Sequence, residues 1–152
     1  MRSFIKINTM WQRIQTLYLG TATALIFSMF FCTFATIIGP DGAEVTIRYS
    51  EKMPYLVLMI MLITAHIAAT ASFKAFFLQA RVSVIAGLLA IGFQIWLAID
   101  FFINRNAMVF NVTALFPLAA AALDFMAAKR SMVDEMTIQS VKSARKARKK
   151  RR

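Results

Sequence analysis

The sequence predicts an all-α protein, a four-helix transmembrane bundle with both termini in the cytoplasm and a basic C-terminal tail. Three observations support this prediction. The 152 residues are 59% hydrophobic with a mean hydropathy of +0.63, well above a typical soluble domain. The apolar residues fall into four runs, each about as long as the hydrocarbon core of a bilayer requires. The basic residues are concentrated behind the last run.

The four runs define the expected membrane domain, residues 16–128. Its expected spans are residues 16–38, 54–78, 82–102 and 109–128. Turn residues from Gly39 to Gly42 end the first run, and Pro54 suits the first turn of the second helix. Pro117 lies inside the fourth run, where it predicts a kink. The connections are short, so we expect no extramembrane domain.

The orientation follows from the distribution of Lys and Arg. An N-terminal flank, residues 1–15, a connection at residues 73–81 and a tail, residues 129–152, hold 15 of the 18 basic residues. The other side holds Arg48, Lys52 and Arg105. Because basic flanks stay in the cytoplasm during insertion, the sequence predicts a membrane protein with both termini in the cytoplasm.

Three segments resemble a known family. They are Met10–Leu19 (Met-Trp-Gln-Arg-Ile-Gln-Thr-Leu-Tyr-Leu), Phe110–Leu118 (Phe-Asn-Val-Thr-Ala-Leu-Phe-Pro-Leu) and the pair Asp134-Glu135. Together they resemble the small bacterial four-span membrane proteins grouped as domain of unknown function 4293. The resemblance covers residues 10–145 and implies four spans in an inner membrane, without an activity. It starts at Met10, so residues 1–9 are interpreted as an extension or as the product of an earlier start codon.

The stretch Lys142-Ser143-Ala144-Arg145 departs from the family pattern. In relatives, the acidic pair is followed by a Ser and then by a stretch like Asp-Arg-Leu-Arg. Ser140 is kept here, but the following stretch is not. The role of that stretch in relatives therefore does not transfer to this chain.

Four polar residues within or beside the runs are candidates for a functional interior, because such residues are costly in lipid. They are His66, Lys74, Gln94 and Asp124. His66 and Lys74 share one helical face, and Lys74 is expected at the depth of Asp124. One interpretation is a small proton-coupled transporter or channel that uses His66, Asp124 and Lys74. The other is a structural clamp in which His66 bonds Gln94.

Composition argues against an enzyme. The chain has one His and one Cys, Cys32, so we expect no internal disulfide, no metal site and no cofactor. We find no Ser with a base beside it and no glycine-rich phosphate loop, so no catalytic residue is predicted.

The tail is the segment best suited to an anionic partner. Residues 129–141 are expected to continue the fourth helix, and residues 142–152 to be disordered by like-charge repulsion. The candidate binding residues are Lys142, Arg145, Lys146, Arg148, Lys149, Lys150, Arg151 and Arg152. Anionic lipid headgroups, ribosomal RNA and an acidic protein are the three candidate partners, and no DNA binding is expected.

These features predict a non-enzymatic accessory or scaffold subunit of a larger inner-membrane assembly. The sharpest form of the hypothesis places the protein beside the translocation machinery, with its tail on ribosomal RNA. Small-residue pairs such as Ala86/Ala90 and Ala120/Ala128 are interpreted as packing within the bundle, with docking of a partner helix as the alternative.

Overall fold

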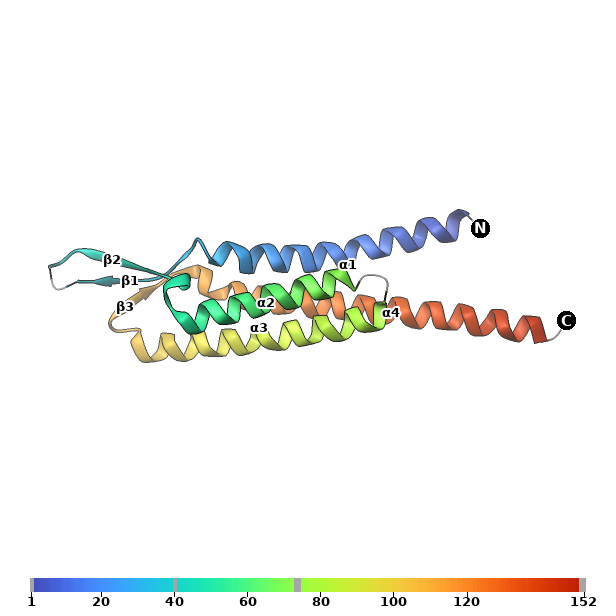
Figure 1. Cartoon of the computed structure of the whole chain (residues 1–152). Coiled ribbons are helices and arrows are strands. Elements are labelled where there is room, and N and C mark those ends of the chain that lie inside the picture. Colours follow the sequence, from blue (N-terminus) through green and yellow to red (C-terminus); the bar gives the residue numbers. More distant parts are fainter. Residues whose placement is uncertain (1, 40, 73–74, 151–152) are drawn as a thin grey trace.

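A computed structural model describes the backbone of residues 2–39, 41–72 and 75–150, and the side chains of residues 14–39, 41–72 and 75–148. Its elements are α1 (Arg2–Met29), β1 (Thr33–Ile38), β2 (Glu44–Arg48), η1 (Tyr49–Glu51), α2 (Met53–Ala71), α3 (Phe76–Asn104), β3 (Met108–Phe110), η2 (Val112–Leu115) and α4 (Phe116–Lys150). The four α-helices form an elongated bundle, with the sheet at one end and both termini at the other (Figure 1).

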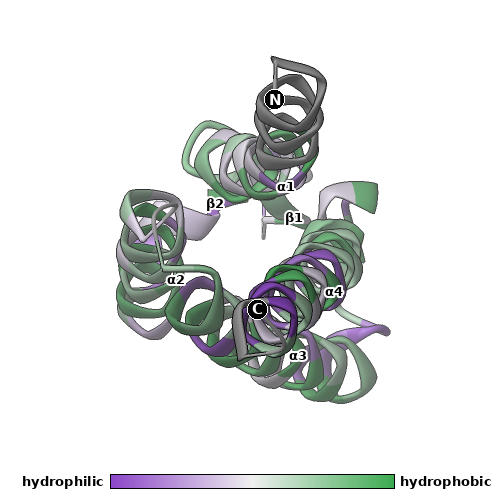
Figure 2. Cartoon of the chain, turned by 90° about the vertical axis from the view of Figure 1, so that its right-hand side faces the viewer, coloured by the Kyte–Doolittle hydropathy of each residue, from purple (hydrophilic) through white to green (hydrophobic). Residues whose placement is uncertain are grey.

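The helices pack as a ring. α1 packs against α2 and α4, and α3 also packs against α2 and α4. The view along the bundle shows the same arrangement (Figure 2). α2 and α4 therefore face each other across the centre, and a contact between them must cross the interior of the bundle.

Within the described part of the chain, three helical segments are long and apolar enough to cross a membrane, namely Met53–Ala71, Phe76–Asn104 and Val112–Arg148, which includes α4. α1 contributes a shorter apolar stretch, Ile14–Met29. Large apolar side chains such as Phe27, Ile67, Leu88 and Ile99 are more than half exposed on the outside of the bundle. Exposed apolar surface of this extent suits contact with lipid.

The expected first span, residues 16–38, is wrong at its C-terminal end. α1 ends at Met29, and Thr33–Ile38 forms strand β1. The run is rich in β-branched and aromatic residues, which favour strands over helices. It pairs antiparallel with β2 around a turn in which Gly42 has φ of +73°, a conformation that glycine adopts at little cost.

The expected fourth span, residues 109–128, begins too early. Met108–Phe110 is strand β3, which pairs antiparallel with β1 and completes a sheet of order β2-β1-β3. α4 begins only at Phe116. Pro117 therefore lies in the first turn of α4, where its missing N–H leaves no hydrogen bond unmade, and the predicted kink is absent.

The expected second span, residues 54–78, is also too long, because α2 ends at Ala71. Phe76 already belongs to α3, which begins before the expected third span, residues 82–102, and ends at Asn104. The turn between α2 and α3 is thus only residues 72–75. Lys74 lies outside the described residues, so its predicted contact with Asp124 is outside them too.

The three-stranded sheet at one end of the bundle was not predicted from the sequence. Phe34, Tyr49, Tyr55 and Phe93 are buried together under the sheet, with ring centroids 5.1 to 6.3 Å apart. Burial raises the pKa of Tyr49 to about 12, and its hydroxyl lies 3.2 Å from that of Thr113. An aromatic cluster therefore fills the sheet end of the bundle.

The tail is helical where disorder was expected. α4 runs without a break from Phe116 to Lys150, so residues 129–141 continue the helix as predicted and residues 142–150 follow. The segment contains no Gly or Pro, and its Ala, Lys and Arg residues are strong helix formers. Cations near a helix C-terminus are also favoured by the helix dipole. These terms offset the like-charge repulsion.

Candidate functional site

His66 of α2 and Asp124 of α4 meet in the centre of the bundle. His66 Nε2 lies 2.9 Å from Asp124 Oδ1 and 3.1 Å from Oδ2, and both side chains are 0% exposed. Because α2 and α4 face each other diagonally, this contact joins two helices that otherwise touch little. Two residues of the candidate proton pathway thus form one buried pair.

Gln94 does not bond His66, so that part of the clamp hypothesis is wrong. The Gln94 side chain lies nearer the sheet end of α3, where its Oε1 accepts a hydrogen bond of 3.2 Å from the backbone N–H of Leu118. The first N–H groups of a helix have no partner within the helix. Gln94 therefore satisfies one of these donors at the start of α4.

Gly87 brings α3 close to α4 beside the pair. A Cβ atom at Gly87 would lie 3.1 Å from Phe125 Cζ and 3.4 Å from Asp124 Cβ. Small buried residues line the rest of this interface, namely Ala80, Ser83, Ala86 and Ala90 on α3 and Ala120, Ala121, Ala127 and Ala128 on α4. Such residues let helix backbones approach closely in lipid, as the small-residue pairs predicted.

The interior is polar on one side of the pair. Among the described residues, the other fully buried polar side chains are Gln15, Gln79, Ser83 and Ser131. By their positions along the helices, all four lie between the His66–Asp124 pair and the end that holds the termini. These four residues were not predicted from the sequence, although the Gln79–Ser83 spacing puts two polar groups on one face of α3.

Four atoms in this polar interior have no hydrogen-bond partner in the structure. They are His66 Nδ1, Gln79 Oε1, Ser83 Oγ and Ser131 Oγ. Buried polar groups are nearly always satisfied by protein or ordered water, and exceptions call for an explanation. Each of these atoms can exchange a hydrogen bond with an ordered water molecule.

A contact between Gln15 and Asp134 lies at the end of the polar interior that is nearest to the termini. The Gln15 side-chain amide donates a hydrogen bond to the Asp134 carboxylate and so joins α1 to α4. Gln15 belongs to the opening motif of the family resemblance and Asp134 to its acidic pair. Two sequence features 119 residues apart are thus one contact.

The opposite end is tied by a second polar network. Lys52 Nζ lies 2.8 Å from Asp100 Oδ2 and 4.5 Å from the centre of the Phe34 ring. Asp100 also accepts hydrogen bonds from the Tyr55 hydroxyl and, at 2.7 Å, from the Asn104 amide. This network and the aromatic cluster beneath it separate the buried pair from the sheet end.

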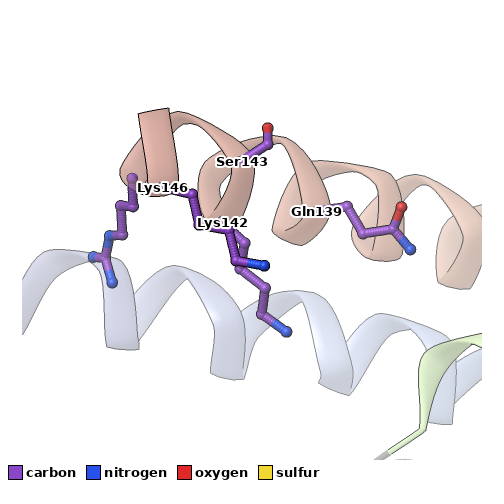
Figure 3. Close-up of a pocket in the computed structure, with 5 residues that line it drawn as sticks. Gln139, Lys142, Ser143 and Lys146 are labelled. Carbon is purple, nitrogen blue, oxygen red and sulfur yellow. The ribbon is translucent and has the colours of Figure 1, made fainter. Parts of the chain in front are cut away.

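The basic tail side chains that the structure describes are all exposed. Lys142, Arg145, Lys146 and Arg148 are exposed; the side chains of Lys149 and Lys150, and all of Arg151 and Arg152, lie outside the description. A groove of about 420 Å³ is lined by Gln139, Lys142, Ser143, Arg145 and Lys146. Lys142 and Lys146 point from α4 toward the neighbouring helix, whereas Ser143 points away from it (Figure 3).

No metal centre accompanies these features within the described part of the chain. In that part, no three His, Cys, Asp or Glu side chains form a group that could hold a metal ion. The described polar and basic residues can form hydrogen bonds, exchange protons at His66 and Asp124, and attract anions along the tail.

Comparison with known proteins gives a family but no activity. A family model described as a domain of unknown function (DUF4293) matches residues 11–143, which confirms the resemblance. No curated protein matches the chain. The match includes the buried pair and the Gln15–Asp134 contact, and it stops before the last nine residues of the basic tail.

Proposed function

The chain belongs to the DUF4293 family, whose description assigns no activity, and we propose from its geometry that it is a non-enzymatic accessory subunit of a larger inner-membrane assembly. In this proposal all four helices cross a bacterial inner membrane. α1 has the shortest apolar stretch, Ile14–Met29. It packs against both α2 and α4, and a short span is accommodated by local thinning of the bilayer.

The proposed orientation has both termini in the cytoplasm. Two observations support it. Both termini lie at the same end of the bundle (Figure 1), as an even number of spans requires. That end also carries 15 of the 18 Lys and Arg residues, which favours the cytoplasmic side.

Cysteine labelling tests this orientation. In a Cys32→Ser background, we expect Ala43→Cys to react with an impermeant maleimide in intact spheroplasts, because it lies in the turn of the sheet. Ser3→Cys and Ser143→Cys should react only after permeabilisation. Labelling of Ser3→Cys in intact spheroplasts would instead mean that only α2, α3 and α4 span the membrane.

The unbroken length of α4 is the observation that carries the accessory role. Residues 129–150 follow the apolar part of α4 and, at 1.5 Å per residue, extend it by about 33 Å. The headgroup layer is only about 5–8 Å thick on each side. α4 continues along the bundle axis rather than turning aside (Figure 1). Its terminal basic residues thus extend past the headgroups, which favours a large anionic partner over lipid.

Ribosomal RNA is the partner we propose for the tail. The described side chains from Val141 to Arg148 are all exposed, and none is acidic or aromatic. Basic side chains around a helix suit a phosphate backbone, and the lack of aromatics removes a platform for stacking bases. A ribosome docked at the translocation machinery would bring such a backbone to the membrane.

Salt-dependent binding to ribosomes tests the tail. Replacing Lys142, Arg145, Lys146 and Arg148 with Gln keeps good helix formers but removes four charges. We expect co-sedimentation with ribosomes to weaken, and the slope of log K against log salt to fall by about 3 in magnitude. Binding that is unchanged in this variant and after truncation behind Val141 would refute the RNA contact.

A proton-coupled transporter or channel is the second candidate function. The observation that favours it is the polar interior with its four unpartnered atoms, which reaches His66 and Asp124 from the terminal end. The aromatic cluster blocks the other half in this conformation. Transport would therefore require an alternative conformation in which the sheet end opens.

Proton flux in proteoliposomes tests this second candidate. With a pH-sensitive dye inside the vesicles, the wild type should carry protons faster than empty vesicles. His66→Gln should abolish that flux while keeping the protein folded, because Gln can still donate a hydrogen bond to Asp124. Equal flux in the variant and the wild type, or none in the wild type, would exclude this function.

A further inference from the structure

A second basic groove lies on the outside of the bundle, apart from the tail. It has a volume of about 300 Å³ and is lined by Tyr18 of α1 and by Met126, Lys129, Arg130 and Val133 of α4. Lys129 and Arg130 directly follow the apolar stretch of α4 that ends at Ala128. The groove is thus half apolar and half cationic, at the depth where α4 leaves the hydrocarbon core.

The lining matches the chemistry of a lipid headgroup. Two adjacent cations attract a phosphate, and the Tyr18 hydroxyl adds a hydrogen-bond donor. Basic pockets between transmembrane helices at the cytoplasmic side are suited to acidic lipid headgroups. Asp134 lies one turn further along α4, where its carboxylate accepts a hydrogen bond from Gln15 and also interacts with the charge of Arg130. The structure shows no carboxylate in the lining of the groove.

The same face of α4 provides room for an acyl chain. Ala119, Ala122, Met126 and Val133 are exposed and recur at the spacing of three, four and seven residues that defines one side of a helix. The side chains of the two alanines are small, so an acyl chain can lie against this face of α4 from the basic pair toward the sheet end; we call this face the track. A soluble phosphate would use the cations but not this track.

We infer that the groove between α1 and α4 is a binding site for one anionic phospholipid. Its phosphate lies between Lys129, Arg130 and the Tyr18 hydroxyl, and an acyl chain follows the track past Met126, Ala122 and Ala119. The inference goes beyond the proposed accessory role. It concerns the membrane boundary of α4, whereas the proposed RNA contact lies in residues 142–152.

Lipid binding to the purified full-length protein tests the inference. In a mild detergent, phosphatidylglycerol, phosphatidylcholine and glycerol phosphate are titrated separately, and bound lipid is counted by native mass spectrometry. We expect one phosphatidylglycerol to bind in preference to phosphatidylcholine. The double variant Lys129→Gln/Arg130→Gln should weaken that binding about 30-fold, at about fivefold per basic residue.

Two control variants make the result specific. Lys142→Gln/Arg145→Gln removes the same charge from the same helix and should leave phosphatidylglycerol binding within about twofold of wild type. Lys129→Arg/Arg130→Lys keeps the charge, so it should restore binding if the double Gln variant lost it through the site rather than through misfolding.

Several outcomes would overturn the inference. Equal weakening by the Lys142/Arg145 variant would make the effect one of overall charge. Equal binding of phosphatidylcholine would show that the groove selects only acyl chains. Binding of glycerol phosphate as tight as that of phosphatidylglycerol would identify a soluble phosphate as the ligand. Unchanged binding in the Lys129/Arg130 variant would place the lipid elsewhere.

Discussion

Replacing Asp124 with Ala is expected to lower the free energy of unfolding of the bundle by about 3 kcal/mol. The substitution leaves His66 buried with no partner at Nε2, while its Nδ1 already lacks one. It also removes the main contact across the α2–α4 diagonal. The loss is measurable as a shift of the unfolding midpoint in mixed micelles of increasing dodecyl sulfate content, followed by circular dichroism.

Two further variants distinguish the contribution of the His66–Asp124 pair to stability from that of the packing around it. Asp124→Asn keeps a hydrogen-bond acceptor and should cost much less than Asp124→Ala. The double variant His66→Leu/Asp124→Leu removes both polar groups and fills the space, so it should regain much of the lost stability, as apolar replacements of buried ion pairs often do. A double variant as unstable as Asp124→Ala would show that the pair is not an independent unit.

The same variants bear on function. If the pair serves only to hold the bundle together, the stable double Leu variant should support every activity of the protein. If the pair carries protons, the double Leu variant should be folded but inactive in the flux assay. Stability and flux measured on one set of variants thus distinguish the clamp from the pathway.

The sequence was informative about the helices and less so about their ends. Four apolar runs predicted four helices because burial in lipid or in a core needs long apolar segments, and four are present. Hydropathy alone could not distinguish helix from strand at Thr33–Ile38, because a short apolar run is compatible with both a membrane helix and a β-strand. The sheet joins the hairpin of β1 and β2 to β3, which pairs with β1 although it is far from it in the chain.

The candidate site was only partly predicted, because contacts between different helices are not visible in local sequence patterns. Helical spacing correctly put His66 and Asp124 into the interior, because each residue shares a face with small or polar neighbours. Spacing within one helix does not show how far neighbouring helices are shifted along their axes relative to each other. Gln94 of α3 was therefore predicted to contact His66, whereas it contacts the start of α4. The Gln15–Asp134 bond joins residues 119 positions apart, and no local pattern reports such a contact.

Gly87→Leu is expected to destabilise the bundle by about 2–3 kcal/mol, because overpacking a tight interface forces helices apart or side chains out of their rotamers. Even a single Cβ at Gly87 would approach Phe125 Cζ to 3.1 Å. The whole Leu side chain must then displace Phe125 or push α3 away from α4, which also lengthens the approach of His66 to Asp124. The same micelle unfolding assay measures the loss.

Gly92→Leu is the matched control, because it places the same side chain on the same helix. A Cβ at Gly92 meets no atom within 4 Å, and the residue is exposed, so its replacement should be neutral or slightly stabilising through better helix propensity. If both variants lost stability equally, the cost would come from adding a large side chain to α3 in general. A loss confined to Gly87→Leu would instead identify the close approach of α3 and α4 as what holds Asp124 against His66.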